Sequence, residues 1–212
     1  MSVVLCHCQA YRRIAQEKIE AVHAACEQAA IPCVSVPDLC YLAAKDTETL
    51  RCLEGAEVVL ACQPRAARAL FPSAVRYMDI RTESVETVLA AICAVPVAPV
   101  VCEPHMPSSW VPWFPVIDYS RCVQCKKCVD FCLFGVFAVE GASVSVVQPD
   151  HCKTDCPACA RICPQNAIIF PKSEEPRLNG ALDEPVMPSP MDRDAFRERL
   201  KHRKLRLFKE DD

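Results

Sequence analysis

Eight cysteines between residues 122 and 163 combine a metal-binding residue type with a regular spacing. They form two sets of four, and Pro164 follows the last of them. In chain order the cysteines are Cys122, Cys125, Cys128, Cys132, Cys152, Cys156, Cys159 and Cys163. Thiolates at such short intervals are typical ligands of iron–sulfur clusters and of zinc. Two residues between neighbouring cysteines let one tight loop surround a metal centre, so we expect this stretch to bind metal.

The first set resembles the cysteine run of bacterial two-cluster ferredoxins. In that pattern three closely spaced thiolates hold one 4Fe–4S cluster, and the fourth thiolate ligates the other cluster. The rule predicts one cluster on Cys122, Cys125, Cys128 and Cys163, and a second on Cys132, Cys152, Cys156 and Cys159. The chain departs from the pattern twice. Leu133 stands in the place of a proline, and one extra residue separates Cys152 from Cys156, so the second set could bind a more exposed or more labile cluster.

Zinc is the main alternative, because four thiolates also suit a tetrahedral zinc ion. Zinc ribbons, however, use two well-separated Cys-x-x-Cys pairs, and four cysteines at such short intervals are hard to wrap around one ion. A disulfide framework is less favoured, since nothing in the sequence directs secretion. The spacing therefore favours iron–sulfur binding over the other two uses of cysteine.

The composition of the 212-residue chain bounds its possible functions. Hydrophobic residues make up 51%, enough for the core of one large domain or two modest ones. The net charge of −3 favours neither nucleic acid nor an anionic membrane as a partner. No apolar run approaches about 18 residues, so we expect no membrane span. The start lacks the basic region of a signal peptide, and seventeen cysteines then indicate a reducing compartment, the cytoplasm.

Residues 1–95 alternate between apolar runs and segments with helical periodicity. Strands are expected at 2–5, 33–36, 57–61 and 75–80, and helices at 11–30, 46–53, 65–70 and 84–93. Such alternation predicts an α/β domain whose parallel sheet is covered on both faces. In such sheets, binding sites form beyond the carboxyl ends of the strands.

Four further cysteines fall near the ends of these predicted strands. Cys6 and Cys8 follow the first strand, Cys40 follows the second by a few residues, and Cys62 ends the third. Their thiolates could converge on one edge of the sheet and bind another iron–sulfur cluster or a zinc ion. The alternative is apolar packing, because free cysteine is a small and often buried residue. Packing is the expected role of the cysteines within apolar patterns: Cys26, Cys33, Cys52 and Cys93.

The first 70 or so residues resemble the N-terminal domain of the A-type subunits of the heterodisulfide reductase family. The resemblance rests on Val3-Val4-Leu5-Cys6-His7-Cys8, on Cys40, and on Val58-Val59-Leu60-Ala61-Cys62-Gln63-Pro64-Arg65. It implies iron–sulfur electron transfer and a possible third cluster. It does not imply flavin chemistry here, because the chain has four glycines and none of them forms a G-x-G-x-x-G loop.

The rest of the chain divides into three predicted parts. Residues 96–117 form a proline-rich linker whose aromatic residues Trp110, Trp113 and Phe114 are expected to pack onto a domain. Residues 118–171 form a small α+β two-cluster ferredoxin-like domain, with a hairpin at 136–140 and 143–147 and a strand at 167–170. Its apolar residues Phe131, Phe134, Ile162 and Ile168 are expected to keep water from the clusters. Residues 172–212 form a flexible tether and a basic helix at 192–209 that could dock on a partner.

The sequence thus predicts a cytoplasmic electron carrier that exchanges electrons with redox partner proteins. It carries no Ser-His-Asp order, no H-E-x-x-H motif and no phosphate-binding loop, so a non-catalytic carrier or an oxidoreductase subunit is favoured over a complete enzyme. Two alternatives remain open. The chain could be the electron-input subunit of an oxidoreductase whose N-terminal domain acts on a substrate, or a non-redox metal-binding or sensing protein.

Overall fold

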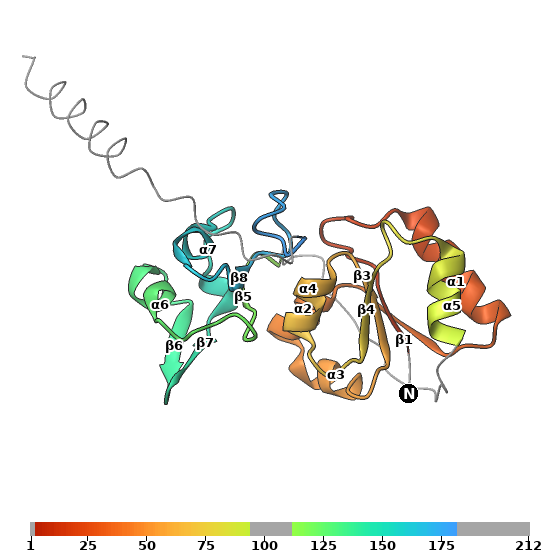
Figure 1. Ribbon diagram of the computed structural model, residues 1–212, viewed down its shortest axis with the longest axis horizontal. Coiled ribbons are helices and arrows are strands. Elements are labelled where there is room, and N and C mark those ends of the chain that lie inside the picture. Colours follow the sequence, from red (N-terminus) through yellow and green to blue (C-terminus); the bar gives the residue numbers. More distant parts are fainter. Residues whose placement is uncertain (1–2, 94–111, 182–212) are drawn as a thin grey trace, which may run out of the picture.

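The computed structural model describes residues 3–93 and 112–181, which form an α/β unit followed by a small α+β unit, as the sequence predicts (Figure 1). The α/β unit is built on a four-stranded parallel sheet with the strand order β2-β1-β3-β4. Its strands are β1 (Val3–Cys6), β2 (Cys33–Val36), β3 (Val58–Ala61) and β4 (Arg76–Asp79). Every residue of β1 and β3 is buried, because both strands are central and helices cover both faces of the sheet.

Five helices cover the sheet. On one face lie α1 (Gln16–Gln28) and α5 (Val85–Cys93), which pack against each other, and on the other lie α2 (Leu39–Lys45), α3 (Thr47–Cys52) and α4 (Pro64–Leu70) (Figure 1). The chain runs from β1 outward to β2 and then back across to β3. The carboxyl ends of β1 and β3 therefore form a topological switch point, where α/β sheets place their ligand sites.

Helix α2 is an element that the sequence analysis did not predict. It begins after Asp38, whose side chain accepts a hydrogen bond from the backbone N–H of Cys40 at 3.0 Å. Such a side-chain cap satisfies one of the free N–H groups at a helix start. The aspartate before an apolar Leu-Cys-Tyr-Leu run is the signal that could have identified the helix.

The α+β unit consists of two short sheets and two short helices. Strand β5 (Val116–Ile117) pairs antiparallel with β8 (Ile168–Ile169), and β6 (Phe137–Glu140) pairs antiparallel with β7 (Ser143–Val146). The predicted hairpin is confirmed, with Gly141 at φ +62° in its turn. Helix α6 (Lys127–Phe131) packs on α7 (Ala158–Ile162), and a 3-10 turn (Pro149–His151) precedes the second cysteine set. In the part of the chain that the structure describes, no helix is both long and apolar enough to cross a membrane.

Residues on either side of the α+β unit pack against the folded units: Trp113 and Phe114 before it, and residues 172–181 after it. Trp113 and Phe114 are buried, as expected of the linker aromatics, and Trp113 lies 5.2 Å from the ring of Phe170 between centroids. Residues 172–181 form a folded strap instead of the beginning of a tether, because Lys172 and Leu178 are buried against the two units. Trp110 and the predicted helix at 192–209 lie outside the described residues.

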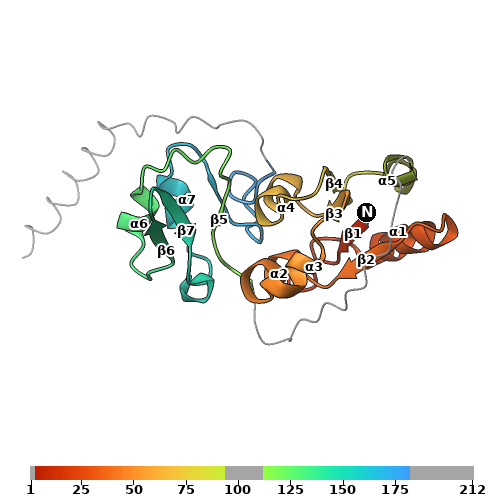
Figure 2. The same ribbon diagram turned by 90° about the horizontal axis from the view of Figure 1, so that it is seen from below.

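The two units contact each other directly (Figure 2). The guanidinium of Arg65, on α4, donates to Oδ2 of Asp118 at 2.8 Å and to the backbone carbonyl of Asn166 at 2.5 Å. Arg65 is 6% exposed, so this ion pair is shielded from water and holds α4 against the start of the α+β unit.

Candidate metal centres

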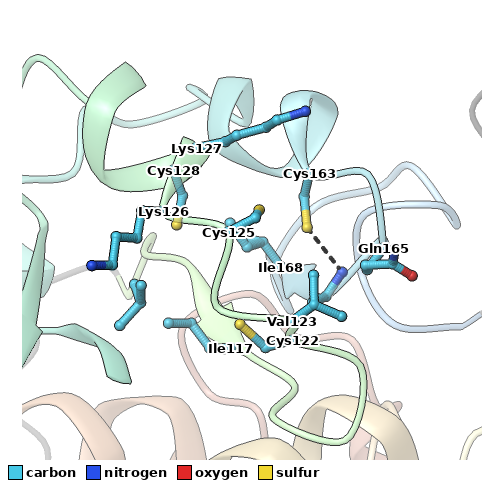
Figure 3. Close-up of a pocket in the computed structure, with 12 residues that line it drawn as sticks. Ile117, Cys122, Val123, Cys125, Lys126, Lys127, Cys128, Cys163, Gln165 and Ile168 are labelled. Carbon is cyan, nitrogen blue, oxygen red and sulfur yellow. Dashed lines mark hydrogen bonds between the residues drawn. The ribbon is translucent and has the colours of Figure 1, made fainter. Parts of the chain in front are cut away.

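The first cavity of the α+β unit has a volume of about 20 Å³ and is lined by four cysteines (Figure 3). They are Cys122, Cys125, Cys128 and Cys163, the set predicted for the first cluster. Three of them come from the loop before α6 and from α6 itself, and Cys163 comes from the end of α7. Cys163 also accepts a hydrogen bond at sulfur from the backbone N–H of Ala167, at 3.3 Å.

The second cavity, of about 380 Å³, is lined by the other four cysteines. They are Cys132, Cys152, Cys156 and Cys159, the set predicted for the second cluster. The rest of the lining is mainly apolar and includes Leu133, which is 91% exposed at the place of the expected proline.

The exchange of the fourth cysteine between the two sets follows from the two packed helices. Helix α6 contains Cys128 and is capped by Cys132, while α7 contains Cys159 and is capped by Cys163. Because each helix leads away from its own loop and packs on the other helix, its capping cysteine lines the opposite cavity. The two cavities thus divide the eight cysteines in the way that the spacing rule predicts.

Backbone conformation allows the loops to turn this tightly. Gln124 and Lys126 adopt positive φ angles of 55° and 60° on either side of Cys125, and Asp155 adopts 60° just before Cys156. Left-handed residues reverse the chain direction within one or two positions. Successive cysteines can therefore face a common space instead of opposite sides of an extended chain.

Burial and neighbouring thiols of the same set raise the pKa of one cysteine beside each cavity. Burial, and then the neighbouring Cys163 and Cys122, raise the pKa of Cys128 to about 11. Burial, and then Cys156 and Cys132, raise the pKa of Cys152 to about 12. Like charges in a shared site disfavour ionisation, and a bound cation reverses this by binding the thiolate form. The thiols that influence each other most therefore belong to the same predicted cluster.

The number of cysteines beside each cavity fits a 4Fe–4S cluster. Within residues 3–93 and 112–181, no group of three or more His, Cys, Asp or Glu side chains is arranged to hold one metal ion. A zinc ion needs its four ligands within about 2.3 Å of a single point. In a four-iron cluster each thiolate ligates its own iron, so the sulfurs are spread around a larger group. Each cavity is lined by four cysteines, which is the number of thiolates that a 4Fe–4S cluster takes.

The expected apolar shield around the clusters is only partly present. Ile168 is buried beside the first cavity. By contrast, Phe131 is 48% exposed, Phe134 is 42% exposed and Ile162 is 36% exposed, so these three side chains form a partly open rim. The reason is the small size of the unit, which has too few residues to cover both sides of its short helices.

The N-terminal cysteines Cys6, Cys8, Cys40 and Cys62 are all buried at the switch point between β1 and β3. The thiol of Cys62 donates a hydrogen bond to the sulfur of Cys8, and the backbone N–H of Leu39 donates to the sulfur of Cys6 at 3.3 Å. The pKa of Cys40 is raised by burial and is also affected by the charges of Cys8 and Cys6. These four residues therefore lie near one another at this edge of the sheet, and their binding of a cluster stays a prediction.

Lys172 places a positive charge inside this group of thiols. Its ammonium donates to Oδ2 of Asp38 at 2.6 Å and to the sulfur of Cys8 at 3.2 Å. The hydrogen bond from Cys62 and the nearby ammonium lower the pKa of Cys8 to about 6, whereas burial and the charge of Asp38 raise the pKa of Cys6 to about 12. The pKa of Cys8 is thus lowered while the pKa of Cys6, two residues earlier, is raised.

Sequence reasoning missed Lys172 and Asp38. Lys172 falls in a polar, proline-rich segment, and no pattern indicates that its side chain is buried. Asp38 carries a weak signal, since it stands where a helix cap is expected. Of the cysteines expected to pack in the core, Cys26 is buried, but Cys52 and Cys93 are exposed because they lie near the ends of short helices.

A small apolar core connects Cys40 to the α+β unit. It contains Cys40 and Ala66 from the first unit together with Phe114, Val116 and Ile169, and Cys152 packs against it. Cys152 lines the second cavity. One N-terminal cysteine, Cys40, and one cysteine of the second set, Cys152, therefore contact the same core.

Comparison with known proteins gives one family model and several relatives. The model of a 4Fe–4S binding domain matches residues 114–137. An uncharacterized ferredoxin of Methanocaldococcus jannaschii is 46% identical over 70 residues, which cover 32% of this chain and 48% of that protein. A second uncharacterized ferredoxin of the same organism is 44% identical over 54 residues, 24% of this chain and 86% of the relative.

A third relative has a more specific description. The pyruvate synthase subunit PorD of Methanocaldococcus jannaschii is 29% identical over 86 residues, which cover 38% of this chain and 99% of that protein. The chain spans about half the length of the first relative and most of the length of the other two.

Proposed function

Because the chain belongs to the 4Fe–4S ferredoxin family through its C-terminal unit, we propose that it transfers electrons through two 4Fe–4S clusters. The observation that carries the proposal is the division of eight cysteines between two cavities, four in each. Cys122, Cys125, Cys128 and Cys163 hold the first cluster, and Cys132, Cys152, Cys156 and Cys159 hold the second. When bound, each cluster supplies a one-electron redox couple.

The residues of the chain tune and protect these centres. The N–H of Ala167 donates to the sulfur of Cys163, and hydrogen bonds to the ligating sulfurs are one of the levers that set the reduction potential. Ile117 and Ile168 line the first cavity and limit the access of water. The second cavity has the exposed Leu133 at its edge, which supports the expectation of a more exposed second cluster.

We also propose that Cys6, Cys8, Cys40 and Cys62 bind a third cluster. The support is their convergence at the switch point, the ammonium of Lys172 among the thiols, and the resemblance to the A-type subunits of the heterodisulfide reductase family. Thiolate ligands bring negative charge into a buried site, and a buried cation offsets part of it. The apolar core that joins Cys40 to Cys152 would make the chain a short path for electrons from one end to the other.

An oxygen-free purification with a count of iron and acid-labile sulfide tests both proposals. About eight irons per chain indicate two clusters, and about twelve indicate three, since each cluster holds four irons. Electron paramagnetic resonance after reduction should show signals of reduced 4Fe–4S clusters. Little iron together with stoichiometric zinc would overturn the electron-transfer function and favour the non-redox alternative.

A second candidate function is that of an electron-transfer subunit in a larger oxidoreductase. The alignment over nearly the whole length of a pyruvate synthase subunit favours it. The chain would then act with catalytic subunits in the cytoplasm. A tagged chain purified without oxygen from its native cells should bring those subunits in a fixed ratio. A chain that purifies alone and still reduces a second ferredoxin supports the independent carrier.

A further inference from the structure

A cavity of about 420 Å³ lies where α4 meets the beginning of the α+β unit, outside both cysteine-lined cavities. Arg65 and Arg68 line it from α4, and residues 117–121 line it from the other side. Its volume is within the range of cavities that bind small molecules. Helix α4 also packs beside β5, so the cavity has walls from both units (Figure 1).

The lining of this cavity carries excess positive charge. Three arginines, Arg65, Arg68 and Arg121, face a single carboxylate, that of Asp118. That carboxylate is already engaged, because Oδ2 accepts from Arg65 at 2.8 Å and Oδ1 accepts from the hydroxyl of Ser120 at 2.5 Å. Asp118 brings one negative charge against three guanidinium groups, and it lies within ion-pair distance of two of them, Arg65 and Arg121.

Arg121 has donor capacity that the described residues do not use. Its Nε lies 3.7 Å from Oδ2 of Asp118, which is too long for a hydrogen bond. Its Nη1 is buried and has no hydrogen-bond partner within residues 3–93 and 112–181. A buried donor of a charged group without a partner costs free energy, so an unsatisfied guanidinium beside a cavity indicates a missing acceptor.

We propose that this cavity binds a small anion that carries a phosphate or carboxylate group. Arg121 and Arg68 would contact its oxygens, since the planar fork of a guanidinium matches both groups. Arg65 adds charge while its hydrogen bonds remain with Asp118 and Asn166. The proposal does not rest on electron transfer, because binding can be measured directly.

The position of the cavity couples it to the first cysteine set. Arg121 precedes Cys122 in the chain, and the backbone N–H of Cys122 donates to the carbonyl of Asp118 at 3.0 Å. Ile117 lines both this cavity and the first cysteine-lined cavity. An anion held by Arg121 would therefore change the electrostatic environment of the first cluster. Its effect on the second cluster would be weaker.

Calorimetric titration of the cluster-loaded full chain with inorganic phosphate and with malonate, at low ionic strength, tests the proposal. We expect saturable binding of at least one probe at one site per chain. Phosphate alone indicates a phosphorylated ligand, and malonate alone indicates a carboxylate ligand. Arg121→Gln should weaken binding by about tenfold or more, the loss expected for one charge-assisted contact. Arg51→Gln, at an exposed arginine on α3, is the matched control and should bind like the wild type.

Iron content and the circular dichroism spectrum should be the same in the wild type and in each variant. A loss of binding then does not reflect a loss of fold. The probe should also shift the paramagnetic-resonance signal of the first cluster in the wild type and not in Arg121→Gln. Absence of saturable binding by either probe would overturn the proposal. Equal binding by wild type and Arg121→Gln, with Arg68→Gln also unchanged, would overturn it as well.

Discussion

Lys172 and Asp38, 134 residues apart in the chain, form an ion pair of 2.6 Å in which both side chains are almost completely buried. Lys172 follows the last strand of the α+β unit, and Asp38 begins α2 of the α/β unit. The pair therefore joins the two units at the group of N-terminal thiols. Its location explains why the strap at 172–181 is folded: moving it away would leave a buried carboxylate without its counter-ion.

Replacing Lys172 by methionine should destabilise the protein by about 3–5 kcal/mol, the usual cost of removing one partner of a buried ion pair. Methionine keeps the length and the apolar part of the side chain but leaves the Asp38 carboxylate uncompensated. The double variant Lys172→Met/Asp38→Asn removes both charges and keeps the acceptor that caps α2. Chemical denaturation should show that the double variant recovers most of the loss. A double variant that is no more stable than Lys172→Met would contradict this account.

The crossed arrangement of the cysteines predicts which cluster each variant affects. Cys163→Ser should disturb the cluster held by Cys122, Cys125 and Cys128, although Cys163 is close in sequence to the other set. Cys132→Ser should disturb the opposite cluster. Each variant should lose up to about four irons, with loss of a different paramagnetic-resonance signal.

Two comparisons control this experiment. Cys52→Ser changes an exposed cysteine outside both cavities and should keep the full iron content. Cys125→Ser changes an undisputed member of the first set and provides the reference spectrum for loss of the first cluster. If Cys163→Ser lost a different signal from the one that Cys125→Ser loses, the cysteines would not be exchanged between the sets.

Gly180 anchors the strap against α4 and should not tolerate a side chain. Its φ is +86°, and a Cβ there would lie 3.3 Å from the backbone nitrogen of Ala66 and 3.3 Å from a methyl carbon of Ile169. Gly180→Ala should therefore cost about 2–3 kcal/mol, through both backbone strain and crowding. Gly141 also has a positive φ but has no atom within 4 Å of such a Cβ, so Gly141→Ala should cost only about 1 kcal/mol. Equal losses of unfolding free energy would mean that the contact with α4 does not limit the site.

Asp118 should contribute stability that disappears in acid. Burial raises the pKa of its carboxyl, but the hydrogen bonds from Ser120 and Arg65 outweigh burial, and the pKa is lowered overall. A carboxyl whose pKa is lower in the folded state than in the unfolded state stabilises the folded protein. The contribution is complete at a pH above the unfolded-state pKa, and it is lost as the pH falls through the folded-state pKa. The difference in unfolding free energy between wild type and Asp118→Asn should be constant above about pH 5 and shrink below about pH 4. A difference that grew toward low pH would contradict the assigned direction.

The sequence by itself determined the parts of this protein that depend on local pattern. The strands β1 and β3 follow from short apolar runs, and the hairpin follows from Gly141 between two alternating segments. The spacing rule also predicts the two crossed sets of four cysteines, and the same two sets line the two cavities; their binding of clusters stays a prediction. The convergence of Cys6, Cys8 and Cys62 could also be predicted, since the carboxyl ends of parallel strands meet at one edge.

Only the tertiary structure decided the features that depend on contacts between distant residues. Nothing local to Lys172 indicates burial, because its partners Asp38 and Cys8 lie 134 and 164 residues away. The arginine-lined cavity likewise exists only because α4 packs against residues 117–121 of the other unit. A periodic pattern records which side of an element is buried but not which distant charge it meets, and in this protein those charges set the environment of the thiols.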